Sequence, residues 1–303
     1  MNYEQMLFKS LENNKDIIIL TAENRGPMRG LPEKCRDKFI DVGIAEQTMI
    51  GMSAGFALRG RIPVVHALAT FLTMRAFEFI RTDIGISNLP VKLVGTLSGF
   101  LSESNGPTHQ ALEDISLMRT IPGMNIFCPA DLNDMVLGLP SVFQSDNPFY
   151  IRYNDKSSLV SHSPFEIGKA EVFGEGKDVC IICYGFLFTQ TYLAKEILER
   201  NGISVKLINV RTLKPLDEAK ILKCISECKM VFTIEDHFLS GGLFTIVSEL
   251  LILNGLFRKI IPFALDSRWF KPLPLDEVLE HENFSAEHIA RKIEESIRDI
   301  ERH

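Results

Sequence analysis

Short apolar runs alternate with helical patterns along most of this chain, and this alternation limits the possible folds more than any other feature of the sequence. The strands expected in the first half are residues 16–20, 39–42, 63–67, 91–97, 125–128 and 149–153. The helices expected between them are residues 46–59, 71–86 and 132–143. Strands and helices alternate in this way in mostly parallel sheets that helices cover on both faces. The sequence therefore predicts an α/β fold.

A polar, serine-rich stretch at residues 154–164 interrupts the alternation and is typical of a linker. Beyond it, strands are expected at residues 179–184, 204–210, 230–235 and 260–264. Helices are expected at residues 189–200, from an N-cap at Asp217 to Cys228, after Gly242, and after an N-cap at Ser285. A chain of 303 residues is long enough for two cores. We therefore predict two domains built on parallel sheets, residues 1–160 and 161–303.

The composition excludes several classes of protein. Hydrophobic residues make up 46% of the chain and charged residues 24%, as in ordinary globular proteins. The net charge is -6 and no basic stripe is present, which argues against a nucleic-acid partner. The N-terminus lacks the basic flank and apolar run of a signal peptide, and the apolar stretches are too short to span a membrane. We expect a cytoplasmic protein with no membrane partner.

Six cysteines are present, and one pair has the spacing of a redox or zinc motif. That pair, Cys180-Ile-Ile-Cys183, lies in an apolar run that reads as a buried strand. Residues three apart on a strand point to opposite faces of the sheet, so these thiols cannot share a metal ion. Cys224 and Cys228 have helical spacing but no second pair of ligands. We expect six ordinary buried thiols and no metal site on this chain.

Two motifs in the first domain suggest its chemistry. The first is Phe39-Ile-Asp-Val-Gly-Ile-Ala-Glu-Gln47, and the second runs from Gly106-Pro-Thr-His-Gln110 to Pro122-Gly123. Together they resemble the pyrimidine-binding domain of the transketolase family, whose members use thiamine diphosphate. Segments of the second domain resemble the transketolase C-terminal domain: residues 209–217, 233–237 and 240–243. The resemblance implies a pyrimidine-binding fold followed by a transketolase C-terminal-like domain.

The family's Gly-Asp-Gly…Asn signature, which holds magnesium and the diphosphate, occurs nowhere in this sequence. The resemblance therefore implies half of an enzyme. We expect an N-terminal transketolase subunit that carries the missing motif and holds most of the Mg²⁺ contacts. We also expect an α2β2 heterotetramer with thiamine diphosphate between the subunits.

Glu46 stands where an expected strand meets an expected helix, at the edge of the sheet where α/β proteins bind ligands. By local sequence alone it reads as an ordinary acidic residue at a helix N-terminus. The resemblance instead implies that Glu46 is the glutamate that activates the cofactor by sharing a proton with its aminopyrimidine ring. In the same way, it implies that Phe71 stacks on this ring, with Met74 and Phe77 completing an apolar wall. The spacing of these three also fits helix core residues.

The resemblance also suggests residues that contact the substrate. His109 would reach the groups of the sugar that gain and lose protons, because imidazole titrates near neutral pH. Arg152 would grip a sugar phosphate, although a salt bridge is a serious rival reading. Asn105 would bind a hydroxyl where many relatives have aspartate, and Leu97 stands where many have histidine. These two departures from the family pattern put in doubt that the substrates are the ordinary pentose phosphates.

The resulting hypothesis is a transketolase-like subunit that transfers a two-carbon ketol unit between sugars or sugar phosphates. Three alternatives stay open: a deoxyxylulose-phosphate synthase-like fragment, a 2-oxo acid dehydrogenase beta subunit and a non-catalytic regulatory subunit. Glu235, Asp236 and His237 look catalytic in isolation, but we expect them to be structural.

Overall fold

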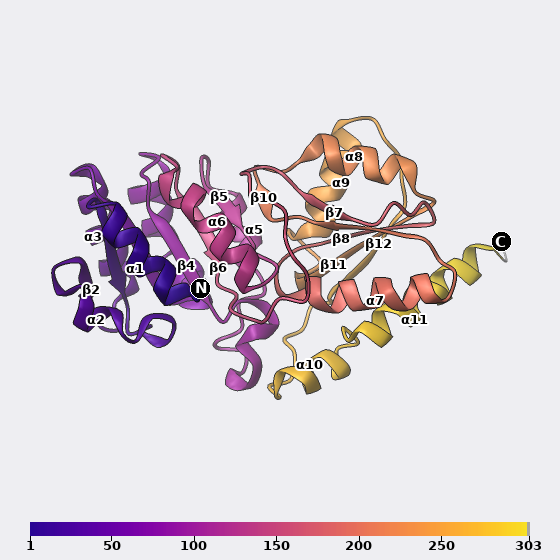
Figure 1. The fold of residues 1–303 in the computed structure, drawn as a ribbon, viewed down its shortest axis with the longest axis horizontal. Coiled ribbons are helices and arrows are strands. Elements are labelled where there is room, and N and C mark those ends of the chain that lie inside the picture. The colour runs from indigo at the N-terminus through magenta and orange to yellow at the C-terminus, as the bar shows by residue number, and fades with distance from the viewer. Residues whose placement is uncertain (302–303) are drawn as a thin grey trace.

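The computed structural model describes residues 1–301, and its strands form two sheets side by side (Figure 1). The seven-stranded sheet has the order β10-β5-β6-β4-β3-β1-β2, and the five-stranded sheet has the order β12-β11-β8-β9-β7. The strands are β1 Ile17–Thr21, β2 Phe39–Asp41, β3 Ile62–Leu68, β4 Lys92–Thr96, β5 Asn125–Phe127, β6 Phe149–Arg152, β7 Glu171–Phe173, β8 Val179–Cys183, β9 Val205–Asn209, β10 Thr212–Lys214, β11 Met230–Phe238 and β12 Ile260–Leu265. All pairings are parallel except those of β10 with β5 and of β7 with β9. The predicted α/β fold with two mostly parallel sheets is confirmed.

Helices cover these sheets. They are α1 Tyr3–Asn13, α2 Leu31–Lys34, α3 Glu46–Leu58, α4 Phe77–Phe79, α5 Asp114–Arg119, α6 Leu132–Gln144, α7 Phe188–Arg200, α8 Glu218–Glu227, α9 Leu243–Leu253, α10 Leu275–His281 and α11 Ala286–Glu301. Asp217 caps α8 as predicted, since its side chain accepts a hydrogen bond from the Lys220 N–H. In residues 1–301, no helix is both long enough and apolar enough to cross a bilayer.

The single helix predicted for residues 71–86 is wrong in detail. Two π-helical segments, Phe71–Arg75 and Ile80–Gly85, flank the three-residue α4. The i→i+5 hydrogen bonds of a π-helix widen its turn, and such segments are frequent at functional sites. The apolar spacing that predicted a continuous helix does not register this change of pitch.

The two halves of the chain are interlocked. Strand β10 belongs by sequence to the second half, yet it pairs with β5 at the edge of the first sheet. One core also runs across the division: it contains Met49 and Ile50 of α3 together with Ile246 and Val247 of α9. A short edge strand and a shared apolar core therefore join the halves.

The two faces of each sheet bury different sets of side chains. In the first sheet, α1 and α6 cover one face through Leu7 and Leu139, while α3 covers the other. In the second sheet, Cys180 lies in the core shared with α3, whereas Cys183 lies in a separate core. The prediction that these two thiols point to opposite faces is confirmed, and all six cysteines are free. The expectation of six buried thiols is wrong for Cys35, which is only partly buried.

Strands β1, β2, β3 and β4 are parallel and in register, so their carboxyl ends meet at one edge of the first sheet. The segments that leave this edge carry most of the residues singled out above. Glu46 follows β2, Phe71 follows β3, and Leu97 follows β4. Parallel sheets bind their ligands at this edge.

Candidate functional site

Glu46 is the first residue of α3 and is almost completely buried, with 2% of its surface exposed. The chain reaches it through a tight turn at Gly43, whose φ of +72° lies in the left-handed region that glycine adopts without strain. The Gly43 N–H donates to Asp41 Oδ1 at 2.9 Å, which fixes the turn. The free N–H groups of the first helical turn favour a negative charge at this position. The local sequence thus holds a carboxylate inside the protein at the edge of the sheet.

Arg75 contacts Glu46, a pairing that the sequence did not indicate. Its Nη1 donates to Glu46 Oε2 at 3.0 Å, although the two residues lie 29 positions apart. Its guanidinium also lies over the Phe71 ring, 4.2 Å from the centroid. The Arg75 side chain is 41% exposed, whereas that of Glu46 is 3% exposed. One cation therefore bridges the buried carboxylate and the aromatic ring.

His109 reaches the same cluster from the loop before α5. Its ring meets Phe71 edge-on, with centroids 5.1 Å apart and planes at 64°. His109 Nδ1 and the Thr108 hydroxyl are 2.9 Å apart, and the tautomer decides which of them donates. The structure thus brings three residues that the sequence singled out, Glu46, Phe71 and His109, into one cluster, with Arg75 between Glu46 and Phe71.

Met74 and Phe77 lie on the same segment but make ordinary packing contacts. Met74 Sδ accepts a hydrogen bond from the Thr70 hydroxyl at 3.5 Å. Phe77 is partly buried against the core that also contains Ile80. Both contacts fit the reading of these residues as part of the helical core, and the apolar-wall role stays a prediction.

Leu97 has a strained backbone and lines a cavity. Its φ is +56°, a left-handed conformation that branched residues seldom adopt and that is often found at functional sites. The cavity has a volume of about 310 Å³ and is lined on other sides by Asn24, Thr96 and Tyr153. The Asn24 amide donates to the Thr96 hydroxyl across its wall. Leu97 therefore lines a cavity at the carboxyl end of β4 whose wall contains both apolar and polar side chains.

Asn105 lies on the exposed loop that leads to His109. Its Nδ2 donates to the Ser102 carbonyl at 2.8 Å, which leaves the side-chain oxygen as an acceptor. Two residues earlier, Glu103 has the irregular backbone angles φ 42° and ψ -117°. The loop is thus bent sharply just before the predicted substrate residue.

The substrate role predicted for Arg152 does not fit its position. The side chain is only 4% exposed, and its Nε and Nη2 donate to Asp114 at 2.8 and 2.9 Å. Its Nη1 donates to Asp236 at 2.5 Å. Burial raises the pKa of the Asp114 carboxyl, but Arg152 outweighs burial, so this pKa is lowered. The guanidinium is occupied by two carboxylates, one from each half of the chain, and a sugar phosphate would have to displace them.

The acidic and imidazole groups of β11 are buried and hydrogen-bonded within the chain, which fits the structural role predicted for them. Glu235 accepts hydrogen bonds from the N–H groups of Leu243 and Phe244 at the start of α9, while burial raises its pKa to about 8. Burial lowers the pKa of His237 to about 4. Glu235 therefore joins β11 to α9, whereas Asp236 pairs with Arg152 of β6 and His237 accepts a hydrogen bond from the Ser116 N–H of α5.

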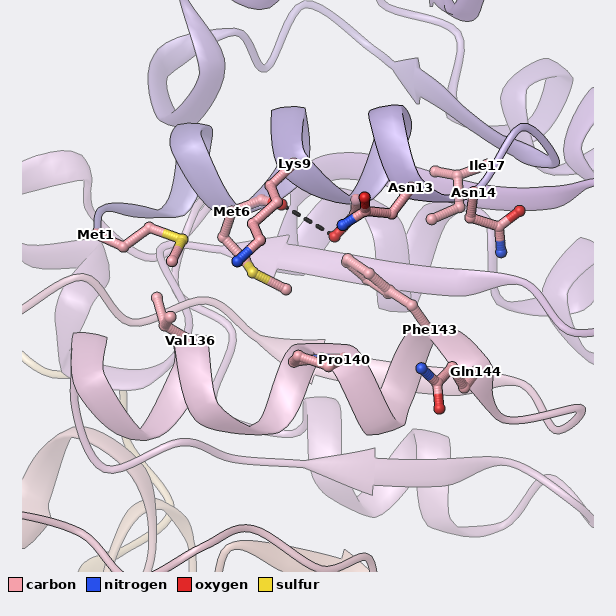
Figure 2. Close-up of a pocket in the computed structure, with 11 residues that line it drawn as sticks. Met1, Met6, Lys9, Asn13, Asn14, Ile17, Val136, Pro140, Phe143 and Gln144 are labelled. Carbon is pink, nitrogen blue, oxygen red and sulfur yellow. Dashed lines mark hydrogen bonds between the residues drawn. The ribbon is translucent and has the colours of Figure 1, made fainter.

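A separate cavity of about 510 Å³ lies between α1 and α6, on the face of the first sheet opposite α3 (Figure 2). Its walls are mainly apolar and include Met6, Ile17 and Phe143. None of the predicted site residues lines it. Within residues 1–301, no group of three or more metal-ligating side chains is placed to hold a metal ion.

Comparisons with known proteins agree with this architecture. The model of the transketolase pyrimidine-binding domain matches residues 2–158, and the model of the transketolase C-terminal domain matches residues 168–289. These matches show that the chain belongs to the transketolase family. It carries the two domains that a split transketolase places in its C-terminal section.

Three relatives illustrate this likeness. A provisionally named transketolase C-terminal section of Methanocaldococcus jannaschii is 31% identical, over 98% of this chain and 95% of its own length. A 6-deoxy-6-sulfo-D-fructose transketolase subunit of Clostridium sp. strain MSTE9 is 33% identical, over 82% and 79%. A 1-deoxy-D-xylulose-5-phosphate synthase of Dictyoglomus thermophilum is 33% identical, over 98% of this chain but only 50% of its own length.

Solved structures show the same fold. A split-gene transketolase described as an inactive beta4 tetramer has a TM-score of 0.86 and 29% identity, covering 97% of this chain and 95% of that one. A Pichia stipitis transketolase has a TM-score of 0.80 but 17% identity, covering 99% of this chain and 46% of that one. The second likeness concerns the fold alone.

Proposed function

We propose that this chain is the C-terminal subunit of a split, thiamine diphosphate-dependent transketolase-like enzyme. It transfers a two-carbon ketol unit between sugars or sugar phosphates together with a separate N-terminal subunit. The observation that carries this proposal is the cluster of Glu46, Phe71 and His109 at the carboxyl edge of the first sheet. A buried carboxylate, an aromatic ring and an imidazole are the three groups that the family's chemistry requires from this domain.

The residues present fit half of the cofactor. Phe71 offers a ring face for stacking, and Glu46 offers a buried carboxylate that contacts the same Arg75 side chain. When bound, thiamine diphosphate supplies the carbanion that attacks the substrate carbonyl. Glu46 holds a proton at the aminopyrimidine ring nitrogen, where a buried carboxyl group can give and take it without competition from water. Phe71 would hold the aminopyrimidine ring by stacking on it.

The diphosphate and Mg²⁺ are assigned to the partner subunit. Magnesium binds through one or two carboxylates together with phosphate oxygens. The part of the chain that the structure describes offers no cluster of three or more metal-ligating groups, and the sequence lacks the family's Gly-Asp-Gly…Asn motif. The N-terminal subunit would supply both, and the active assembly would be a cytoplasmic α2β2 heterotetramer. The relative described as an inactive beta4 tetramer supports the view that this half is inactive alone.

The substrate is assigned through three side chains. His109 exchanges protons with the hydroxyl and carbonyl groups of the sugar, and Asn105 hydrogen-bonds a hydroxyl through its free oxygen. Leu97 offers no polar contact in its cavity, so a sugar that needs one there is disfavoured. The relative named for a sulfo-sugar supports a modified rather than an ordinary pentose phosphate. Residues 1–160 carry this chemistry, and residues 161–303 stabilise the assembly.

A deoxyxylulose-phosphate synthase-like activity is the second candidate. Its relatives match nearly the whole chain, but the chain spans about half of their length. Such an enzyme takes pyruvate as the donor. The reconstituted complex should therefore be assayed with a ketose donor and with pyruvate, each with the same aldose acceptor. Turnover with pyruvate as the donor, and none with the ketose, would favour this second candidate.

The test of the main proposal is Glu46→Gln in the reconstituted complex. Exchange of the cofactor's thiazolium proton, followed by NMR, should slow by about 10²–10⁴-fold, because an amide cannot hold the proton. Glu78→Gln is the matched control, because Glu78 is exposed on α4. The thiazolium proton should exchange at the wild-type rate in this variant complex. An unchanged rate in Glu46→Gln would remove Glu46 from the mechanism.

A further inference from the structure

Arg75 makes both contacts that the aminopyrimidine ring of the cofactor would need. Its planar guanidinium lies 4.2 Å from the centroid of Phe71, where the ring would stack. Its Nη1 also donates to Glu46 Oε2 at 3.0 Å, where the ring nitrogen would bond. A guanidinium resembles an aminopyrimidine in being flat, in stacking on aromatic faces and in donating N–H groups to a carboxylate.

We propose that Arg75 is a latch on the cofactor site: it occupies Phe71 and Glu46 in the free subunit and leaves them when the cofactor binds. This inference rests on the proposed function, because it takes Phe71 and Glu46 as the residues that receive the aminopyrimidine. The latch keeps the site closed, because Arg75 holds the Glu46 oxygen and the Phe71 ring face that the aminopyrimidine would use. The latch therefore lowers the affinity of the free subunit for the cofactor.

The strength of the latch follows from its exposure. The Arg75 side chain is 41% exposed, so its ion pair with Glu46 is partly screened by solvent. A partly exposed cation–π contact adds a similar small contribution. Together they favour the closed arrangement by about tenfold, and the apparent affinity for the cofactor falls by the same factor. Because the Arg75 side chain is partly exposed, it can also move into solvent without disturbing the core.

The experiment measures binding of thiamine diphosphate to the full-length chain by titration calorimetry with Mg²⁺ present. Arg75→Met removes the charge and the planar group, and it should bind the cofactor about tenfold more tightly than the wild type. Arg75→Lys keeps the charge but not the planar stacking group, so its affinity should fall between the two. Circular dichroism verifies that each variant is folded.

Arg59→Met is the matched control. Arg59 follows the last residue of α3 and so lies about 20 Å along the helix from Glu46. The variant removes the same charge from the chain without touching the cluster, and its affinity should equal that of the wild type. A general electrostatic effect would change both methionine variants alike and would overturn the latch.

Two other results would overturn the latch. Equal or weaker binding by Arg75→Met would show that Arg75 assists the cofactor or has no effect on it. No binding by Arg75→Met would show that the opened site does not accept the ring. Neither result decides the proposed function, which is judged separately by thiazolium proton exchange in the wild-type complex. If the wild-type complex exchanges this proton, the function stands even where the latch fails.

Discussion

Replacing Arg152 by methionine separates its structural role from the phosphate-binding role suggested by the sequence. Arg152, Asp114 and Asp236 are all at most 4% exposed at their side chains, and Arg152 bridges the two carboxylates. Arg152→Met would leave both carboxylates buried without their cation. Breaking a buried ion pair in this way costs roughly 3–5 kcal/mol of the free energy of unfolding. Because Asp236 belongs to the second sheet and Asp114 to the first half, the loss should weaken the contact between the halves.

The destabilisation caused by Arg152→Met should also depend on pH, and the pKa values of the two carboxyl groups give the direction. Burial raises the pKa of Asp236 and this effect prevails, whereas at Asp114 the Arg152 charge outweighs burial and lowers the pKa. In Arg152→Met both carboxyl groups lose that charge, so the pKa of each rises. A carboxyl group whose pKa is higher in the folded state than in the unfolded state, where it is about 4, destabilises the protein as the pH rises above 4. The variant should therefore be more destabilised at pH 8 than at pH 5.

The assay is urea unfolding of the isolated chain at both pH values. Arg25→Met is the control, because Arg25 is 56% exposed in its pair with Asp41 and should contribute only about 0–1 kcal/mol. Adding Asp236→Asn to Arg152→Met should restore part of the stability by removing one unpaired charge. A loss below about 1 kcal/mol in Arg152→Met, with no dependence on pH, would contradict this account of the buried cluster.

Four further outcomes are expected. The purified chain should show no ketol transfer until it is mixed with a subunit that carries Gly-Asp-Gly…Asn, and full activity of the single chain would exclude a split enzyme. Leu97→His combined with Asn105→Asp should shift the substrate preference of the complex toward xylulose 5-phosphate. His109→Ala should lower turnover on every substrate. If the wild-type complex already used xylulose 5-phosphate at ordinary transketolase rates, the specificity argument from Leu97 and Asn105 would be disproved. His162 lies between Asp131 and Glu171, with 2.8 Å to each carboxylate, and these partners outweigh burial and raise its pKa to about 9. The contribution of His162 to the free energy of unfolding is therefore complete below about pH 6.5 and is lost as the pH rises through about 9. Urea unfolding at several pH values should show this loss, and His162→Gln should abolish it.

Much of the fold could be predicted because it depends on local burial. Each run of apolar residues is long enough to form one strand, so the strands of both sheets, β7 and β10 excepted, were predicted to within three residues of their observed ends. The same reasoning placed Cys180 and Cys183 on opposite faces, since alternation along a strand is a local property. Glu46 could be placed at the edge of the sheet because strand order along the chain fixes which loops leave that edge.

Only the tertiary structure decided which groups meet. Arg152 finds Asp114 and Asp236 at separations of 38 and 84 residues, and no periodic pattern records such a pairing. Arg75 likewise reaches Glu46 across 29 residues, through a π-helical turn that apolar spacing does not reveal. The sequence by itself determined where side chains would be buried, because burial follows from the hydrophobic pattern of each segment. The partner of a buried charge depends instead on where distant segments pack, and the folded chain alone sets that.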